Sequence, residues 1–201
     1  MAVLILMKPM KTLSIECEVS LMNILLFNGG TSNKNTKLVV ETYKKFCELR
    51  GHNVTLLDEY YKDCLNCQVC STKGNCCVKD TLTSTLTKRF DCITIATPVY
   101  FFYMSAKAKA FLDRLYCLDK ENMIFSLLCV SGSPFEESGI DLIEESIDRA
   151  CDYCNAHRTN TFYKVTSDIF TGKLEESDEY WLEEVIKDME VLYCETKESR
   201  K

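Results

Sequence analysis

The sequence lacks the features that mark several large classes of protein. No apolar run in its 201 residues reaches the roughly 18 residues that a membrane-spanning helix needs. Basic residues are in deficit, because 24 Lys and Arg stand against 30 Asp and Glu, which gives a net charge of -6. Such a charge disfavours a nucleic-acid surface and a polybasic membrane attachment. We therefore expect no nucleic acid and no membrane among the partners, which should be small molecules or proteins.

Motifs of several enzyme classes are missing as well. The chain contains neither G-x-G-x-x-G nor G-x-x-x-x-G-K-[ST], so dinucleotide-binding and nucleotide-hydrolysing hypotheses lose their main support. His52 and His157 are the two histidines, and no metalloprotease helix motif or nucleophile elbow accompanies them. Hydrolase hypotheses therefore have no residues to name, and we predict no catalytic side chain.

An export signal is also missing. The N-terminal stretch MAVLILM has no positive charge before it, is interrupted by Lys8 and Pro9, and is followed by no small-residue cleavage site. We expect a cytoplasmic, reducing location, in which 13 cysteines do not imply a disulfide framework. Residues 1–21 carry no helix or strand period that the fold needs. The hypothesis is that residues 22–197 form one domain and that residues 1–21 are an extension outside it.

What is present is an alternation of strands and helices. Compact apolar runs predict five buried strands, at residues 23–27, 53–57, 92–97, 123–130 and 161–166. Helical periodicity lies between them, and a last helix is expected to begin near Ser177 with Trp181 on its buried face. Near-continuous apolar strands linked by helices are typical of a parallel sheet covered on both faces. We predict a doubly wound α/β fold with a five-stranded parallel sheet.

A polar loop, NGGTSNKNT, follows the first strand at residues 28–36. An α/β fold often binds a phosphate between its first strand and first helix. Backbone amides at two glycines and several side-chain donors suit a phosphate monoester and favour a mononucleotide such as FMN. These residues are Gly29, Gly30, Thr31, Ser32, Asn33, Asn35 and Thr36. Because such residues occur in turns everywhere, a plain helix-capping turn is an alternative of equal weight.

An aromatic loop follows the third strand, at the sheet edge where open α/β folds bind ligands. Pro98 and Val99 lead into four consecutive aromatic residues, Tyr100, Phe101, Phe102 and Tyr103. Four aromatic rings are costly to leave in water, and they can pack against a flat ring such as isoalloxazine. The alternative is a dimer contact or a plug in the core, and it is compatible with flavin binding.

Three segments, NILLFNGGTSNKNTKLV (23–39), CLNCQVCSTKGNCCVKD (64–80) and ATPVYFFYMSAKAKAFLDR (96–114), together resemble the NADPH-dependent FMN reductase and iron-sulfur flavoprotein family. The resemblance implies a flavodoxin-like fold with strand order 2-1-3-4-5, bound FMN, and a homodimer or homotetramer. Phe102 departs from the family, in which a glycine is common at this place. The FMN contacts that it implies are Gly30, Thr31, Ser32, Asn35, Thr36, Pro98, Val99, Tyr100, Phe101, Phe102, Ser131 and Gly132.

The cysteines crowd into residues 63–80, which we expect to be a single loop. Cys64, Cys67, Cys70 and Cys76 have the spacing C-x2-C-x2-C-x5-C, and four thiolates can hold a [4Fe-4S] cluster. The resemblance carries these four residues over as ligands of such a cluster. Zinc, which usually takes two separated C-x2-C pairs, and a metal-free, redox-active thiol loop are the alternatives. Cys77 receives no role. The cysteines predicted to be small hydrophobes are Cys47, Cys92, Cys117, Cys129 and Cys194.

The sequence therefore predicts an FMN-dependent NAD(P)H oxidoreductase. Electrons would pass from reduced flavin to a small-molecule or protein acceptor, directly or through the cysteine-bound cluster. One rival hypothesis is a flavodoxin-type electron carrier that binds FMN but has no nicotinamide turnover. Another is a thiol- or metal-binding module that binds no flavin. The sequence does not choose between NADH and NADPH, and it does not name the final acceptor.

Overall fold

The computed structural model describes residues 21–31, 35–117, 122–166 and 174–199. Its strands are β1 (Asn23–Asn28), β2 (Asn53–Leu57), β3 (Cys92–Tyr100), β4 (Tyr103–Met104), β5 (Ile124–Ser131), β6 (His157–Arg158) and β7 (Phe162–Val165). Its helices are α1 (Asn35–Leu49), α2 (Val69–Lys73), α3 (Thr81–Leu86), α4 (Ala106–Arg114), η1 (Leu115–Cys117), α5 (Phe135–Ser138), α6 (Ile140–Cys154) and α7 (Glu176–Glu198).

The central sheet is parallel and runs β2-β1-β3-β5-β6. β7 also pairs parallel with β5, farther along it, because Ile124 faces His157 whereas Leu128 faces Phe162. The edge strand is therefore in two pieces, of which β7 corresponds to the predicted strand at residues 161–166 and β6 was not predicted. With β6 and β7 counted as that edge strand, the predicted doubly wound fold and its strand order 2-1-3-4-5 are confirmed.

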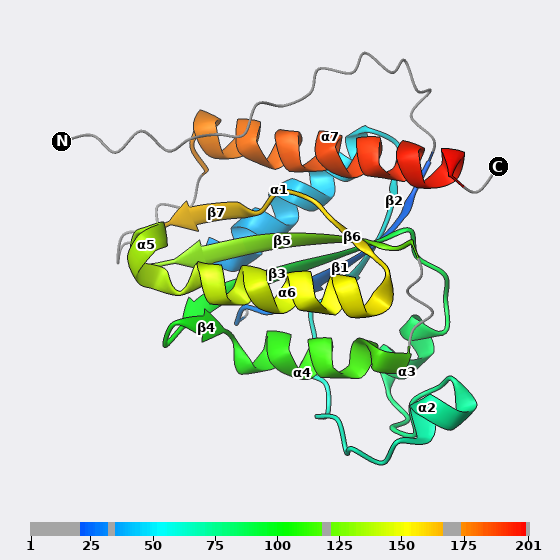
Figure 1. Cartoon of the computed structure of the whole chain (residues 1–201). Coiled ribbons are helices and arrows are strands. Elements are labelled where there is room, and N and C mark those ends of the chain that lie inside the picture. Colours follow the sequence, from blue (N-terminus) through cyan, green and yellow to red (C-terminus); the bar gives the residue numbers. More distant parts are fainter. Residues whose placement is uncertain (1–20, 32–34, 118–121, 167–173, 200–201) are drawn as a thin grey trace.

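Helices cover both faces of the sheet. Figure 1 shows α1 and α7 on one side and α4 and α6 on the other. Along β1, Ile24 and Leu26 belong to the core beneath α1 and α7, whereas Leu25 and Phe27 belong to the core beneath the other helices. All four side chains are fully buried. This double burial explains why the strands read as unbroken apolar runs.

The helix ends follow local chemistry. Gly51 has φ 90° just after α1, where the sequence predicts a C-terminal cap, and glycine adopts this left-handed conformation without a steric penalty. α7 begins at Glu176, one residue before the predicted start, because Glu175 and Asp178 form a reciprocal capping box. Trp181 on this helix is half-buried and meets Phe162 edge-on.

The cysteine-rich stretch is not the single loop that the sequence predicts. Residues 69–73 form α2, a short helix between Gln68 and Gly74, and both of these flanking residues have left-handed backbone conformations. The prediction of inert thiols is confirmed for Cys47, Cys92 and Cys129, which are buried. It is wrong for Cys194, which is disulfide-bonded. Burial raises the pKa of the Cys92 thiol to about 12. In the part of the chain that the structure describes, no helix is long and apolar enough to cross a membrane.

Candidate functional site

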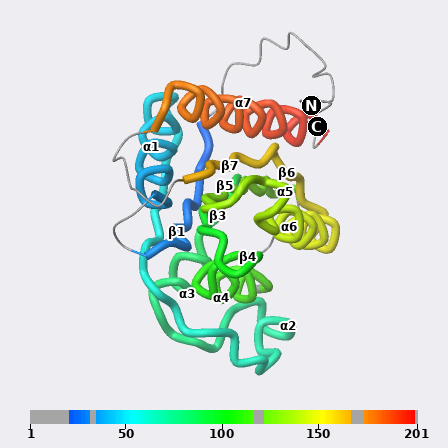
Figure 2. The backbone as a smooth tube through the Cα atoms, turned by 90° about the vertical axis from the view of Figure 1, so that its left-hand side faces the viewer, coloured from blue at the N-terminus to red at the C-terminus, as the bar shows by residue number. Residues whose placement is uncertain are grey.

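The three segments predicted to contact FMN meet at the carboxyl edge of the sheet. The Gly29 amide donates to the Ala96 carbonyl (2.7 Å), and the Ser105 hydroxyl donates to the Gly29 carbonyl (2.7 Å). These bonds join the loop after β1 to β3 and to the segment after β4. Pro98 pairs with Val130, which places Ser131 beside Val99. Figure 2 looks at the molecule from the side on which the β3–β4 hairpin projects.

The loop after β1 forms a hydrogen bond with a buried asparagine at the end of that strand. Asn28 is fully buried, its side-chain oxygen accepts from the Gly30 amide (2.9 Å), and its amide nitrogen donates to Asp58 (2.8 Å). Gly29 must be glycine, because a Cβ there would lie 2.8 Å from the Ala96 oxygen. These contacts fix the backbone at Gly29 and Gly30, and the N-terminus of α1, which begins at Asn35, attracts anions.

The predicted phosphate donors differ in their placement. Thr31 is exposed and Asn35 is half-buried at the start of α1. Thr36 is buried against Gly30, and a Cβ built on Gly30 would lie 2.8 Å from the Thr36 Cβ. Ser32 lies outside the described residues. Asn33 lies outside them as well, so the structure places three of the five hydroxyl and amide side chains predicted as phosphate donors.

Lys107 is a charged residue of this site that the sequence did not single out. Its ammonium group donates to the Asp58 carbonyl (3.0 Å) and to the Gly30 carbonyl (3.3 Å), and it lies 5.7 Å from the centre of the Phe27 ring. The side chain is 13% exposed. Lys107 also forms an ion pair with the Asp58 carboxylate (3.4 Å), so it places a positive charge beside the loop that Asp58 partly balances.

The aromatic loop is a tight β3–β4 hairpin that holds its rings in solvent. Phe101 and Phe102, at its tip, have φ 50° and φ 66° and are 96% and 58% exposed. Tyr100 is 53% exposed. Left-handed backbone at two consecutive phenylalanines is unfavourable and is typical of functional loops. Exposed rings on a strained turn, at the ligand-binding edge of a parallel sheet, are suited to a flat aromatic ligand.

The hairpin rests on the junction between α5 and α6. Gly139 has φ 81°, and a Cβ at this position would lie 2.2 Å from the Phe102 carbonyl oxygen. The hydroxyl of Tyr103, in turn, makes a 2.6 Å hydrogen bond with Ser146 on α6. The segment after β5 is more open, because a Cβ on Gly132 would meet no atom within 4 Å. The hairpin backbone is thus packed closely against Gly139, whereas the segment at Gly132 has open space beside it.

These features fit FMN. A loop of backbone amides at a helix N-terminus, with a lysine beside it, suits a phosphate, and the exposed hairpin rings suit a flat tricycle. Asn28, Asp58, Ser105 and Lys107 support the site but were missed from the sequence. The local signal for Ser105 is its place as N-cap of α4, where its hydroxyl accepts from the Ala108 amide (3.1 Å).

The cysteine-rich segment lies away from this edge. Figure 1 shows α2 and α3 beside the C-terminal end of α4, whereas the β3–β4 hairpin is at the other end of that helix. Arg114, the last residue of α4, binds both ends of the segment. Its guanidinium donates to the Lys62 carbonyl (3.2 Å) and forms a two-pronged ion pair with Asp80 (2.5 and 2.9 Å).

The predicted four-thiol site is not assembled in the described residues, which contain no group of three or more His, Cys, Asp or Glu side chains placed to hold a metal ion. The side chains of Cys70 and Cys76 are partly buried, and Cys64 is exposed. Cys67 instead lies next to Cys77, with 3.0 Å between the sulfur atoms. The hydrogen bond with Cys77 lowers the pKa of the Cys67 thiol, and it raises the pKa of Cys77 to about 11.

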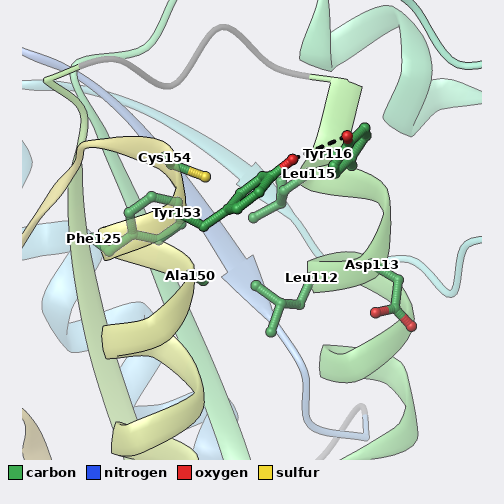
Figure 3. A pocket seen from close by; sticks show the side chains of 8 residues that line it. All are labelled: Leu112, Asp113, Leu115, Tyr116, Phe125, Ala150, Tyr153 and Cys154. Carbon is green, nitrogen blue, oxygen red and sulfur yellow. Dashed lines mark hydrogen bonds between the residues drawn. The ribbon is translucent and has the colours of Figure 1, made fainter. Parts of the chain in front are cut away.

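A separate pocket lies between the end of α4 and the end of α6. It has a volume of about 200 Å³ and is mainly apolar, and at its rim the hydroxyl of Tyr153 donates to that of Tyr116 (3.0 Å). Figure 3 shows the two rings side by side above Leu115, with Asp113 pointing away. The pocket is at the opposite end of α4 from the hairpin, and we assign it no part in flavin binding.

Comparisons with known proteins identify the family of this chain. The family described as NADPH-dependent FMN reductase matches residues 22–142. An iron-sulfur flavoprotein of Archaeoglobus fulgidus is 32% identical over 98 residues, which are 46% of this chain and 48% of that protein. The chain therefore matches about half the length of that relative.

Two solved structures show the same fold. One is RosB with bound 8-demethyl-8-formylriboflavin-5'-phosphate, which has a TM-score of 0.66 at 14% identity, over 90% of this chain and 82% of the other. The other is the apo form of the NADH:FMN oxidoreductase EMOB, which has a TM-score of 0.64 at 17% identity, over 85% of this chain and 89% of the other.

Proposed function

Because this chain belongs to the NADPH-dependent FMN reductase family, we propose that it binds FMN at the carboxyl edge of its sheet and passes electrons from a nicotinamide nucleotide to an acceptor. The observation that carries this proposal is the β3–β4 hairpin, whose exposed rings Phe101 and Phe102 stand on left-handed backbone beside a polar loop. An exposed apolar patch built at such a cost in backbone strain is explained by a ligand that covers it.

In this proposal each segment has one task. The backbone from Gly30 to Thr36 holds the phosphate of FMN, with Lys107 as the neighbouring positive charge. Tyr100, Phe101 and Phe102 pack against the ring, and Ser131 and Gly132 border its far side. The matching region of the family, residues 22–142, contains every one of these segments.

Bound FMN supplies the redox chemistry, which is hydride acceptance followed by electron transfer. The protein binds and orients the flavin, and it leaves an open side for the nicotinamide and then for the acceptor. Gly132 is suited to that open side, because a Cβ added to it would have no neighbouring atom within 4 Å. No side-chain acid or base is needed for hydride transfer to the flavin, so neutral substitutions of titratable groups at this edge should leave the rate of flavin reduction in the FMN-loaded protein nearly unchanged.

Turnover with nicotinamide separates this proposal from a flavodoxin-type electron carrier. The FMN-loaded protein is mixed anaerobically with NADH or NADPH, and the loss of oxidised-flavin absorbance is followed. We expect rapid bleaching with at least one nucleotide and sustained oxidation of that nucleotide when a quinone is added. Bound flavin that neither nucleotide reduces would refute the reductase activity while leaving FMN binding intact.

Flavin binding itself is tested by shortening one exposed ring. Phe101→Ala removes a ring that is 96% exposed, so the variant should fold normally. Loss of one aromatic contact should weaken FMN binding by about 1.4 kcal/mol, or tenfold in Kd. Tyr180→Ala on α7, which is also exposed, is the matched control and should bind FMN as the parent does. Equal FMN affinity in the two variants would place the flavin elsewhere.

The iron-sulfur part of the prediction remains a prediction. Its support is the spacing of Cys64, Cys67, Cys70 and Cys76 and the similarity to the iron-sulfur flavoprotein of Archaeoglobus fulgidus. The arrangement of the described side chains does not fit four ligands on one centre, so we derive no step through a cluster. Iron and sulfide assays on protein made without oxygen test it, and serine at any of the four positions should sharply reduce both.

We also propose that the FMN-binding domain begins at Met22. Met22 is fully buried, its amide donates to His52 (3.4 Å), and the family match begins at the same residue. A chain that lacks residues 1–21 should therefore keep its FMN affinity and melting temperature. A large loss of either quantity would show that the deleted segment belongs to the fold.

A further inference from the structure

Two exposed thiols in the cysteine-rich segment are already in contact. The sulfur atoms of Cys67 and Cys77 lie 3.0 Å apart, and both side chains are exposed. Two thiolates on one zinc ion, at about 2.3 Å from the metal, would be separated by about 3.8 Å. The observed distance is shorter than that and about 1 Å longer than a disulfide bond. The pair therefore has the spacing of a dithiol rather than that of two ligands of one metal ion.

The backbone on both sides of Cys67 has an unfavourable conformation. Asn66 and Gln68, on either side of Cys67, have φ 49° and φ 58°. Asparagine tolerates the left-handed conformation better than most residues, but glutamine gains nothing from it. Two left-handed residues around one cysteine turn the chain sharply just before α2. This costly local conformation is a second observation, independent of the distance between the sulfur atoms.

We propose that Cys67 and Cys77 form an intramolecular disulfide, with hydrogen peroxide as the oxidant. The thiolate of one cysteine attacks a peroxide oxygen, the O–O bond breaks, and a sulfenic acid forms while hydroxide leaves and takes up a proton. The second thiol attacks that sulfur, the S–O bond breaks, the S–S bond forms, and water leaves. Two thiols and one peroxide thus give one disulfide and two waters.

This assignment gives Cys77 a function and changes that of Cys67. A sulfur atom in a disulfide cannot also act as a thiolate ligand. Formation of the bond therefore removes Cys67 from the set of four cysteines with C-x2-C-x2-C-x5-C spacing. The oxidised segment would keep at most three of those four thiolates, so the disulfide and a four-thiolate centre exclude one another.

Peptide mapping of the full chain tests the proposal. Trypsin cuts after Lys62, Lys73 and Lys79, so Cys67 and Cys77 fall in different peptides, residues 63–73 and 74–79. Reduced, chelator-treated protein is exposed to peroxide, alkylated and digested. We expect a linked pair of these two peptides that has lost two hydrogens and that separates on reduction. The assay needs no flavin, so its outcome is independent of the proposed reductase function.

Matched variants identify the partner of Cys67. Cys76 is in the same peptide as Cys77, but its thiol lies near the Arg114 guanidinium, whose pKa is raised mainly by the hydrogen bond with Asp80 and further by Cys76. Cys76→Ser should keep the linked peptides, whereas Cys77→Ser should reduce their yield at least about tenfold. Circular dichroism checks that both variants fold. The absence of linked peptides in the parent protein, equal yields in the two variants, or loss only in Cys76→Ser would overturn the proposal.

Discussion

The ion pair between Arg114 and Asp80 offers the sharpest test of how the cysteine-rich segment is held to the fold. Arg114 is 2% exposed and the Asp80 side chain is 19% exposed, so the pair is largely shielded from water. We expect Asp80→Asn to destabilise the protein strongly. Asparagine still accepts the hydrogen bond from the Thr83 amide that caps α3, so the variant changes the charge and keeps the cap.

The size of the effect follows from the burial of Arg114. Removal of one partner from a buried ion pair costs about 3–5 kcal/mol, because the other charge is left without compensation. Arg114 retains its bonds to the Lys62 carbonyl and the Thr83 hydroxyl (2.6 Å), so we expect a value near the lower end, about 3 kcal/mol. That is a large part of the roughly 5–15 kcal/mol that is typical of domain stability.

Urea unfolding followed by circular dichroism measures this loss. Asp113→Asn is the matched control, because its partner is Lys109 on the same helix and both side chains are 45% exposed. An exposed pair of this kind contributes about 0–1 kcal/mol. If Asp80→Asn loses no more stability than Asp113→Asn, the buried pair does not hold the segment as we argue.

Lowering the pH should remove the stability that the ion pair between Arg114 and Asp80 contributes. The hydrogen bond from Arg114 is the main cause that lowers the pKa of Asp80. A carboxyl with a lowered pKa stabilises the fold above its unfolded pKa, and this stability is lost as the pH falls through the folded value. The difference in stability between the parent and Asp80→Asn should therefore be complete near neutral pH and shrink below about pH 4. A difference that stays constant well below that pH would contradict this assignment.

Three further predictions concern the flavin edge. Thr36→Ala should weaken FMN binding by about 1.5–3 kcal/mol in a fluorescence titration, and an unchanged Kd would place the phosphate elsewhere. Lys107→Met should weaken FMN binding roughly three- to tenfold at low salt and less at high salt, because salt screens the charge; equal affinities at low salt would exclude this role. Gly139→Ala should cost more than about 2 kcal/mol in urea unfolding, whereas Gly132→Ala, with open space around it, should cost little; equal losses would contradict the close contact with Phe102.

The sequence predicts the sheet well because its central strands β1, β3 and β5 are buried on both faces. Leu25 and Leu26 point to opposite cores, so their apolar character is visible without any knowledge of the partners. The break between β6 and β7 cannot be predicted from the apolar pattern, because it depends on which residues of β5 each strand pairs with. Local patterns therefore determine the strands, and the details of the edge strand depend on the assembled sheet.

The residues of the candidate site also fall into those with a local sequence signal and those that depend on the assembled fold. Gly30 and Phe101 are predictable, because glycine and a run of aromatics after a strand are local signals. Lys107 is not predictable, because its role depends on its distances to Gly30 and Asp58, which come from other segments. The contact between Cys67 and Cys77 also escapes the spacing rule, since it depends on the left-handed turn around Cys67.

The hydrogen bonds of Arg114 affect how well the chain tolerates insertions and deletions in the cysteine-rich segment. One side chain fastens Lys62 and Asp80, so the 17 residues between them leave and rejoin the domain at a single buried point. The cost of closing a loop rises only slowly with its length, about 0.6 kcal/mol for each doubling. Insertions or deletions among the cysteines would therefore alter the thiol spacing without shifting the register of β2 or β3. The segment can thus diverge in its ligand chemistry while the flavin edge stays unchanged.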